Sequence, residues 1–361
     1  MRIGLLGTRG IPNKYGGFEE FAEKITEHWV NEGHEVIVYC ESGDKSFEDV
    51  LPNGVKRIFI KTFQRSLKGF YLFLYDYQST KDAVRRNCDV IYHAGYQSAA
   101  FGNWFLREKL AGRLVYNMDG LEWMRSKWSK PIQIITKYFE KQAAKSGALL
   151  VADNKGIQDY LNSKYNVSSE LIAYGADKVE NLEPEYLKKY GLHPSTYNIL
   201  VARFEPENNL EAVIRAHIKA EQHLIVIANN TTAHYKELSQ LMDTSEFINF
   251  LGPIYNKVML NTLRAFSKYY FHGHTVGGTN PSLLEAMACK CNILAHDNSF
   301  NRDVLKENGY YWKDSESIVN LLSKTSNLEF NNEKQLSYLE SNYSWKQVAL
   351  DHIKVFNSLK E

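Results

Sequence analysis

Cysteine is scarce in this chain. Only four cysteines occur among its 361 residues, and no two of them form a Cys-x-x-Cys pair. Without that spacing, and without a histidine at a matching distance, the cysteines predict neither a zinc site nor a disulfide framework. We therefore expect four buried or free thiols and no metal centre built on them.

An excess of charge of one sign is also missing, because 43 basic residues stand against 42 acidic ones. This balance argues against a general nucleic-acid-binding protein. No apolar run approaches the ~18 residues that a bilayer-spanning helix needs. Met1 leads directly into a strand-like segment without the pattern of a signal peptide. We expect a cytoplasmic protein.

Short apolar strands alternate with amphipathic helices along the chain. In the first half, strand-like runs cover 2–7, 35–40, 55–60, 89–93, 114–118, 148–152 and 170–173, with helical patterns at 18–31, 77–86, 98–109, 131–146 and 155–164. After a charged, proline-containing stretch, strands recur at 198–202, 223–228, 247–252, 269–272, 292–295 and 310–312, with helices at 208–220, 233–241, 257–265, 281–289 and 316–323. This winding predicts an α/β fold with parallel sheets covered on both faces.

The charged stretch at 176–195 predicts a division into two doubly wound, Rossmann-like domains, 1–175 and 176–343, consistent with about 150 residues per domain. The final segment, 344–361, has apolar residues at helical spacing, and we expect it to pack back across the first domain. Because such sheets bind ligands at the carboxyl ends of their strands, we expect the two domains to face a central cleft.

A glycine-rich turn that opens a helix is the most informative motif. Its residues are Gly277, Gly278, Thr279, Asn280, Pro281 and Ser282. Asn280 suits the N-cap and Pro281 the first helical position, and the free N–H groups of such a helix start favour phosphate. Glu285 lies one turn further along, where its carboxylate could accept two ribose hydroxyls. The motif predicts a nucleotide-diphosphate ligand. A capped helix without a ligand is the alternative, but capping alone gives the doubled glycine no purpose.

A second glycine-rich loop follows the first strand, at 7–19. Its spacing is not Gly-x-Gly-x-x-Gly, so a nicotinamide fingerprint is absent where it would be expected. Gly16 and Gly17, just before a helix, predict a second anion site, and Arg9 and Lys14 add positive charge nearby. We interpret the loop as functional, with a flexible surface connection as the alternative.

Polar and aromatic residues follow two further strands. Asp119 and Glu122 come after the fifth strand and could bind sugar hydroxyls or take a proton. Trp123 could stack on a sugar ring. His93 and Tyr96 follow another strand end. Loop carboxylates without chemistry, and rings that simply fill the core, are the alternatives at these positions.

Arg203 ends the first strand of the second half. A fixed guanidinium there could stabilise the negative charge that develops on a leaving diphosphate. A surface arginine paired with Glu205 or Glu207 is the alternative. His272 and His274 precede the glycine-rich turn, but no third ligand stands at a suitable spacing, so we do not expect a metal site.

Basic and aromatic residues interleave over 61–75. Such a segment can lie on an anionic membrane surface. A core helix with a solvated basic end is the alternative interpretation.

Together these motifs resemble the GT-B glycosyltransferases of family 4, and more narrowly a rhamnosyltransferase-like bacterial subgroup with a TRGIPxxYGGFE signature, here Thr8 to Glu19. The segments 119–123, 201–209 and 277–288 match the same subgroup in order and spacing. The resemblance implies a metal-independent transfer of a sugar from a nucleotide-diphosphate donor, without a cofactor, to a glycan or lipid-linked acceptor.

The resemblance also implies roles for individual residues. The second domain is expected to bind the donor, with Arg203 and the glycine-rich turn at the diphosphate and Glu285 at the ribose; Gly16 and Gly17 add to this set. The first domain is expected to bind the acceptor through Arg9, Tyr15, His93, Tyr96, Glu122 and Trp123. Arg203, Asp119 and Glu285 are the expected catalytic residues.

Three positions depart from the family pattern. Gly277 stands where the family has its first glutamate, Asn208 where it has a lysine, and Asp119 where a histidine is common. The first two departures leave the diphosphate dependent on Arg203 and on backbone donors. The third places a carboxylate near the reacting carbon. A retaining reaction is implied by the family, and an inverting route with Asp119 as base stays open.

The sequence therefore predicts a glycosyltransferase of cell-surface polysaccharide synthesis, at the inner face of the membrane, that uses a dTDP- or UDP-linked donor of rhamnose or a related deoxysugar. A sugar-nucleotide epimerase is one alternative, although the acceptor-side signature argues against it. A non-catalytic nucleotide-sugar-binding protein is the other, and the departures at Gly277 and Asn208 leave it open.

Overall fold

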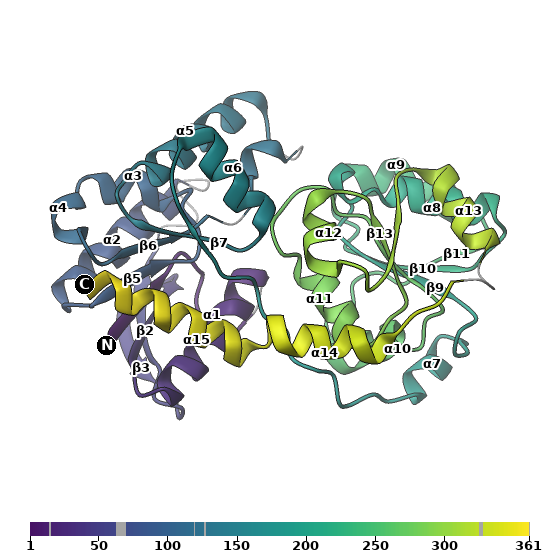
Figure 1. The fold of residues 1–361 in the computed structure, drawn as a ribbon, viewed down its shortest axis with the longest axis horizontal. Coiled ribbons are helices and arrows are strands. Elements are labelled where there is room, and N and C mark those ends of the chain that lie inside the picture. The colour runs from purple at the N-terminus through teal and green to yellow at the C-terminus, as the bar shows by residue number, and fades with distance from the viewer. Residues whose placement is uncertain (14–15, 63–69, 119, 126–127, 325–327, 361) are drawn as a thin grey trace. The chain divides into compact units, whose positions relative to one another are not determined.

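The chain forms two compact units. The computed structural model describes residues 1–361 except 14–15, 63–69, 119, 126–127, 325–327 and 361. The first domain combines Met1–Trp123 and Trp128–Gly175 with the C-terminal segment Trp345–Glu361, and the second consists of Ala176–Ser344 together with Met124–Lys127. Figure 1 shows both in one ribbon. No helix in the described part of the chain combines the length and the apolar composition needed to cross a bilayer.

The first domain is built on an eight-stranded sheet in the order β3-β4-β2-β1-β5-β6-β7-β8. The strands are β1 (Arg2–Leu6), β2 (Glu35–Ser42), β3 (Phe47–Val50), β4 (Lys56–Lys61), β5 (Val90–His93), β6 (Leu114–Asn117), β7 (Leu149–Ala152) and β8 (Glu170–Leu171). All neighbours pair in parallel except β3, which runs antiparallel to β4 at the sheet edge. The sequence did not predict β3, a short, charged strand whose Phe47 ring stacks on Phe59 at 4.1 Å.

Helices cover both faces of this sheet. They are α1 (Gly17–Asn31), α2 (Tyr71–Arg85), α3 (Ala99–Trp104), α4 (Arg107–Leu110), α5 (Lys130–Ala144), α6 (Lys155–Tyr165) and α15 (Trp345–Asn357), with single turns at η1 (Glu122–Met124) and η4 (Ser358–Lys360). On β1, Ile3 and Leu5 belong to the core that α1 and α15 close. Gly4 points the other way, and a Cβ there would lie 3.6 Å from Ala83 of α2, because side chains alternate across a strand.

The C-terminal helix α15 is part of the first domain. Its residues Trp345, Val348 and Phe356 are buried in the same core as Trp29 of α1, and the Trp29 and Phe356 rings lie 5.4 Å apart. Figure 1 shows α15 alongside α1, although the two helices stand at opposite ends of the sequence. Burial of this apolar stripe is what fixes the terminal helix on the domain.

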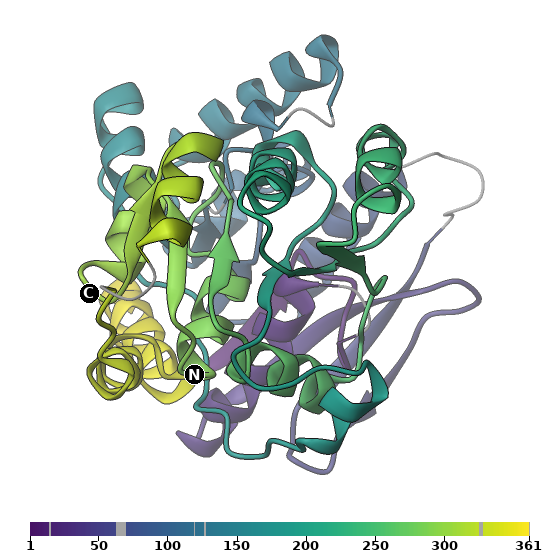
Figure 2. The ribbon, with the colours of Figure 1, turned by 90° about the vertical axis from the view of Figure 1, so that its right-hand side faces the viewer.

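The second domain has a six-stranded, fully parallel sheet in the order β11-β10-β9-β12-β13-β14. Its strands are β9 (Asn198–Val201), β10 (Leu224–Ile227), β11 (Ile248–Phe250), β12 (Tyr270–His272), β13 (Ile293–His296) and β14 (Tyr310–Trp312). Its helices are α7 (Glu185–Lys189), η2 (Pro206–Asn208), α8 (Leu210–Lys219), α9 (Ala233–Asp243), α10 (Lys257–Ala265), α11 (Pro281–Ala288), α12 (Ser299–Leu305), α13 (Ser315–Ser323) and α14 (Asn332–Tyr343). Figure 2 shows the ribbon turned by 90° from the view of Figure 1.

The parallel direction of the strands brings distant loops to one edge of the second sheet. β9 and β12 are neighbours in the sheet, so the loop that follows Val201 and the loop that follows His272 leave it side by side. The same edge receives the start of α11. Carboxyl ends of parallel strands are where ligands bind in open α/β sheets, and the predicted residues of the second domain gather here.

Candidate functional site

The loops after β9 and β12 are hydrogen-bonded to each other. Both the amide and the hydroxyl of Thr275 donate to the carbonyl of Glu207, at 3.0 and 2.9 Å. The Asn209 side chain donates to the carbonyl of Gly273 at 2.8 Å. A Cβ at Gly273 would lie 2.1 Å from the carbonyl oxygen of Asn208, so only glycine allows this approach. These hydrogen bonds between the two loops fix the position of Arg203 relative to the glycine-rich turn.

Asn208 has a structural role within this loop. Its side-chain amide donates to the carbonyl of Arg203 at 2.9 Å, and the residue is 3% exposed. Asn208 stands where the family resemblance leads one to expect a lysine. In this chain the position therefore holds the backbone beside Arg203 and does not supply a cation.

Arg203 itself is exposed. Its guanidinium forms no ion pair with any residue that the structure describes, so pairing with Glu205 or Glu207 does not account for it. The pKa of the His274 imidazole is lowered mainly by burial and secondly by the positive charge of Arg203. Arg203 and the strand that leads to the glycine-rich turn therefore lie close together, as a diphosphate site requires.

The start of α11 corrects one expectation. Asn280 is the N-cap, as predicted, and its side chain accepts from the amide and the hydroxyl of Ser282 at 3.0 and 2.9 Å. Leu283 donates its amide to the Asn280 carbonyl, and Pro281 has no N–H. The prediction that the first turn of this helix presents free N–H groups is therefore wrong, because the helix caps itself.

Backbone donors remain just before the cap. The amides of Gly277 and Gly278 find no acceptor among the residues that the structure describes. Gly277 has φ +128, a conformation that L side chains rarely adopt, although a Cβ there would meet no atom within 4 Å. The turn thus keeps glycine for its backbone shape, and the space above it is open. Successive amides in such a turn can bind an anion.

Glu285 forms an ion pair with a buried arginine. The Arg264 guanidinium on α10 donates to Oε2 of Glu285 at 2.6 Å. The Arg264 side chain is 2% exposed, whereas that of Glu285 is 43% exposed. Burial alone would lower the pKa of Arg264, but the Glu285 carboxylate keeps that pKa above its ordinary value. One oxygen of Glu285 is therefore anchored, and the other is available to an incoming hydroxyl.

Three rings form a column beside this pair. Tyr270 and His272 stack at 6.4 Å, and His272 and His274 stack at 4.5 Å with an interplanar angle of 16°. Both ring nitrogens of His272, Nδ1 of His274 and the Tyr270 hydroxyl are buried without a hydrogen-bond partner among the described residues. Burial lowers the pKa of His272 well below its ordinary value. Buried polar atoms without partners are rare, and here they gather next to the anchored carboxylate.

The predicted anion site at the start of α1 is already balanced by acidic groups. Gly16 is the N-cap and offers no side-chain cap, but Glu19 and Glu20 occupy the first turn. The Glu19 carboxylate accepts the amide of Arg9 at 3.0 Å. Two carboxylates at this helix start oppose an added anion, which weakens the assignment of Gly16 and Gly17 to the donor. Lys14 and Tyr15 lie outside the described residues.

His93 and Tyr96 are core residues. His93 is fully buried, with Nε2 within 3.2 Å of the Thr80 hydroxyl and 3.1 Å of the Asn103 amide. Burial lowers the pKa of His93 to about 3, so the ring is neutral. Tyr96 is 1% exposed, and its hydroxyl donates to Glu140. Neither side chain is available to an acceptor in this structure, and their predicted role does not agree with this burial.

Glu122 and Trp123 lie on the η1 turn, partly exposed. The Glu122 carboxylate accepts the indole N–H of Trp128 at 2.8 Å. The Trp123 indole donates to Glu140 at 3.0 Å, and the Lys137 ammonium lies 3.9 Å from the centre of its ring. Lys137 thus takes a ring face that a sugar was expected to use. Asp119 lies outside the described residues, so its assignment stays a prediction.

Glu140 of α5 was not singled out by its sequence context. It is 1% exposed, and its two oxygens accept four hydrogen bonds at 2.6 to 3.2 Å. The donors are Tyr96, Trp123, Tyr160 and Tyr165. This buried carboxylate holds together aromatic side chains from η1, from α6 and from the segment between β5 and α3. A lone glutamate in an amphipathic helix carries no sequence signal for that role.

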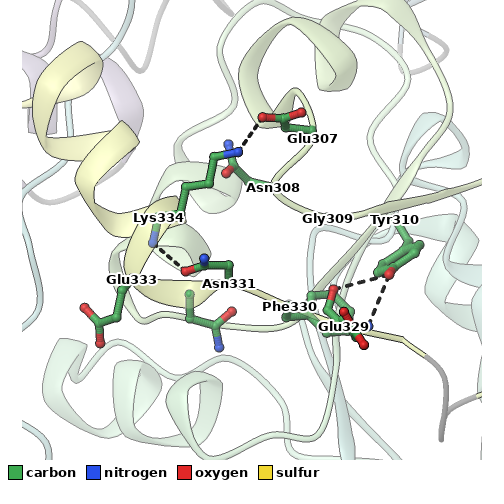
Figure 3. A pocket seen from close by; sticks show the side chains of 10 residues that line it. Glu307, Asn308, Gly309, Tyr310, Glu329, Phe330, Asn331, Glu333 and Lys334 are labelled. Atoms are coloured by element: carbon green, nitrogen blue, oxygen red, sulfur yellow. Dashed lines mark hydrogen bonds and ion pairs between the residues drawn. The ribbon is translucent and has the colours of Figure 1, made fainter.

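A hollow of about 840 Å³ lies elsewhere in the second domain, lined by 307–310 and 329–334 (Figure 3). It precedes β14 in the chain and so lies at the amino end of that strand, on the opposite edge of the sheet from the glycine-rich turn. Glu307 and Lys334 form an ion pair across it. Its position separates it from the candidate site. Within the described residues, no group of three metal-ligating side chains occurs.

The two-domain architecture matches solved structures over the whole chain. Sucrose-phosphate synthase from Thermosynechococcus elongatus has a TM-score of 0.80 at 14% identity, covering 99% of this chain and 98% of that one. HepE from Anabaena in complex with UDP has a TM-score of 0.71 at 15% identity, with 99% of each chain covered. An α,α-trehalose-phosphate synthase from Burkholderia xenovorans, in complex with glucose-6-phosphate, has a TM-score of 0.73 at 11% identity, with 100% of each chain covered. The fold is that of the GT-B class.

Two family models match the sequence in succession. A domain of unknown function, DUF1972, matches residues 2–177, and the glycosyl transferases group 1 domain matches residues 183–344. The second match contains Arg203, the glycine-rich turn and the Arg264–Glu285 pair. No protein with a curated description matches the sequence at a significant level. The second half of the chain carries a glycosyl transferases group 1 domain, and the whole chain has a GT-B fold, so the protein is a glycosyltransferase.

Proposed function

We propose that this glycosyltransferase transfers rhamnose or a related deoxysugar to a glycan or lipid-linked saccharide during cell-surface polysaccharide synthesis. The second domain binds the donor, and the first domain binds the acceptor at the inner face of the membrane. The class of enzyme follows from the group 1 domain, and the choice of sugar rests on the TRGIPxxYGGFE-type signature at Thr8 to Glu19.

The single observation that carries the donor site is the anchored carboxylate of Glu285. Arg264 holds one oxygen at 2.6 Å from inside the domain, which leaves the other oxygen of this partly exposed side chain to accept a ribose hydroxyl. A carboxylate held in place by a charge-assisted hydrogen bond loses little freedom when it binds. The nucleotide is then oriented with its diphosphate toward the glycine-rich turn.

The diphosphate is bound ahead of the helix cap. The amides of Gly277 and Gly278 donate to it, together with the guanidinium of Arg203, because the first-turn amides of α11 are occupied by Asn280. As the bond between the sugar and the diphosphate breaks, negative charge grows on the leaving oxygen. Arg203 stabilises that charge. Asn280, Pro281, Ser282 and Thr279 shape the turn.

The stacked histidines contribute neutral hydrogen bonds. Because burial keeps His272 uncharged, and the lowered pKa of His274 does the same for that ring, the imidazoles add no positive charge to the site. His274, the more exposed of the two, precedes the glycine-rich turn in the chain, so its ring is the one proposed to lie near the diphosphate.

The stereochemical course depends on a residue of the first domain. In a retaining reaction the leaving diphosphate draws the proton of the acceptor hydroxyl on the same face of the sugar. In an inverting reaction Asp119 takes that proton from the opposite face. We propose the retaining course on the strength of the family resemblance.

Calorimetry with dTDP, UDP and GDP tests the donor site. We expect one nucleotide diphosphate to bind clearly, dTDP or UDP, and we expect Glu285→Ala to weaken it. Incubation of the matching nucleotide sugar with and without acceptor then tests the reaction. Product that forms only with acceptor supports transfer, isomerised donor in its absence would indicate an epimerase, and no binding of any of the three nucleotides would contradict the site.

A further inference from the structure

We propose that the exposed surface of α3 and α5 docks the enzyme on an anionic lipid bilayer. This surface consists of Phe101, Trp104, Phe105, Ile134, Ile135 and Tyr138, each between 49% and 71% exposed. It lies in the first domain, outside the donor site, where α3 and α5 run beside each other (Figure 1, Figure 2). The inference rests on the proposed membrane location and not on the identity of the sugar.

The aromatic side chains form one continuous surface. Ring centres of Trp104 and Phe105 lie 5.1 Å apart, and those of Phe105 and Phe101 lie 5.5 Å apart. Phe101 then contacts Phe139 of α5 at 6.4 Å, and Phe139 contacts Tyr138 at 6.0 Å. Large apolar side chains that are exposed singly need no explanation, whereas a contiguous group marks an interaction surface.

The surface extends toward α2. Phe73 of α2 lies 5.5 Å from Phe139, and Phe70 lies 5.4 Å from Phe73 with 59% of its own area exposed. These two residues belong to the basic and aromatic segment 61–75 that the sequence associates with a membrane, of which 63–69 lie outside the described residues. The described end of that segment therefore continues the surface of α3 and α5.

The charge around the surface is mostly positive. Arg107 and Lys109 border it on the side of α3, and the guanidinium of Arg107 lies 5.0 Å from the centre of the Trp104 ring. On α5, Lys130, Lys137 and Lys141 supply further positive charge. Glu140 of α5 is buried and accepts hydrogen bonds from four donors, which leaves Glu108 of α4 as the exposed acidic residue of α3, α4 and α5.

On the exposed face of α5, lysines and apolar side chains follow one another along the helix axis. Lys130, Ile134 and Tyr138 follow one another at four-residue spacing, and Lys141 and Lys145 continue the same face. Apolar side chains thus lie in the middle and lysines at both ends. Ile134, the most exposed of them at 71%, would enter the apolar boundary of the bilayer while the lysines reach the lipid headgroups.

The composition favours a lipid surface over a protein partner. Protein interfaces are depleted in lysine, whereas anionic lipids attract lysine and arginine near the membrane. Aromatic residues are enriched at the boundary between headgroups and acyl chains. Exposed aromatic rings, isoleucines at the centre and basic residues at the border together fit an anionic bilayer.

Co-sedimentation of the full chain with phosphatidylglycerol-containing vesicles, against pure phosphatidylcholine vesicles, tests the proposal. We expect binding to the anionic vesicles that weakens with salt and falls at least about tenfold in Ile134→Ser/Tyr138→Ser, a loss of about 1.4 kcal/mol. The charge variant Lys130→Glu/Lys141→Glu/Lys145→Glu should also release the protein. Tyr255→Ser, an 83% exposed residue of the second domain, is the matched control and should bind as the unaltered protein does.

Equal vesicle binding by the variants and the unaltered protein would overturn the proposal, and so would no binding to anionic vesicles at low salt. Loss of self-association by Ile134→Ser/Tyr138→Ser in sedimentation velocity, without an effect on vesicles, would instead assign the surface to a second copy of the chain. Nucleotide binding in the absence of vesicles is measured in parallel, so that failure of the donor site is distinguished from failure of the membrane surface.

Discussion

Arg264 and Glu285 form an ion pair in which the arginine is buried and the glutamate is exposed. Their closest atoms lie 2.6 Å apart, with side-chain exposures of 2% and 43%. The pair crosses from α10 to α11 and directs a negatively charged group outward beside the glycine-rich turn. Because the buried guanidinium depends on its partner, this position links the stability of the domain to the proposed binding of the donor.

Replacing Glu285 should therefore weaken both properties. Glu285→Ala removes a charge-assisted hydrogen bond to the nucleotide, which we expect to cost about 1–3 kcal/mol of binding free energy in calorimetry. It also leaves Arg264 buried without its carboxylate, which lowers the free energy of unfolding by less than the roughly 3–5 kcal/mol known for fully buried pairs, because Glu285 is partly solvated. Glu211→Ala, which breaks the exposed pair with Arg215, is the control.

Arg264→Leu tests whether the arginine acts through Glu285. The variant should weaken nucleotide binding although Arg264 is too buried to contact the ligand. In a double-mutant cycle, the loss on changing both residues should be smaller than the sum of the single losses. Additive losses would show that Arg264 does not position the carboxylate.

Replacing Arg203 should affect turnover more than substrate binding. In the proposed mechanism the guanidinium acts on charge that develops as the diphosphate leaves, so we expect Arg203→Ala to lower kcat about 10²–10³-fold, the scale known for removal of one transition-state donor. Arg215→Ala, on the same domain, should leave kcat unchanged. A change confined to KM would assign Arg203 to ground-state binding alone.

Adding the family's glutamate at Gly277 should not improve the enzyme. Gly277 has φ +128, so Gly277→Glu forces a side chain into a conformation that costs on the order of 1–3 kcal/mol. The added carboxylate would also stand where two amides are proposed to receive a diphosphate. We expect lower thermal stability and weaker nucleotide binding, measured by differential scanning fluorimetry and calorimetry. Gly147→Glu is the control, because Gly147 is also at positive φ and likewise has no atom near its Cβ; it separates the backbone cost from the effect of the charge at the turn.

Asp119→Asn distinguishes the two reaction courses. If Asp119 is the base of an inverting reaction, the variant should abolish transfer, because the amide takes no proton. If the reaction is retaining and Asp119 orients an acceptor hydroxyl, we expect a reduced but measurable rate. The anomeric configuration of the product, read by nuclear magnetic resonance, provides an independent check on the course.

The sequence predicted most of the repeating elements, because their apolar periods are strong. Helix α10 and strand β14 have the predicted bounds, Lys257–Ala265 and Tyr310–Trp312. The elements that it missed are short or polar. β3 is a four-residue edge strand with two acidic residues, and α7, in the expected linker, has five residues, three of them charged. A single helix was expected over 98–109, where the structure has α3 and α4.

The candidate site was partly predictable for the same reason. Arg203 and the turn at Gly277 each follow a strand, and parallel topology brings the ends of β9 and β12 together. Arg264 could not be predicted, because an arginine on an amphipathic helix ordinarily faces solvent, and its partner lies 21 positions further along the chain. The burial of His93 could not be predicted either, because a histidine at the end of a strand has the same sequence context whether it belongs to a core or to a site.

Asp76 on α2 predicts a pH dependence of stability in the first domain. Burial raises the pKa of its carboxyl to about 7, while a hydrogen bond from Ser98 opposes the shift. In the unfolded chain the carboxyl ionises near its usual value, so between about pH 4 and pH 7 the unfolded state binds fewer protons than the folded state. The free energy of unfolding contributed by Asp76 should therefore fall as the pH rises through that window and stay constant above it.

Asp76→Asn removes the ionisable group and keeps an acceptor for Ser98. Urea unfolding should show the variant to be more stable than the unaltered protein at pH 8, by about 1 kcal/mol or more, with the difference vanishing near pH 4. Asp159→Asn, at an exposed position on α6, should show no such gain. If Asp76→Asn destabilises the protein equally at both pH values, the buried carboxyl is charged and paired in the native protein. A neutral analogue increases the free energy of unfolding at high pH only where the buried carboxyl resists ionisation.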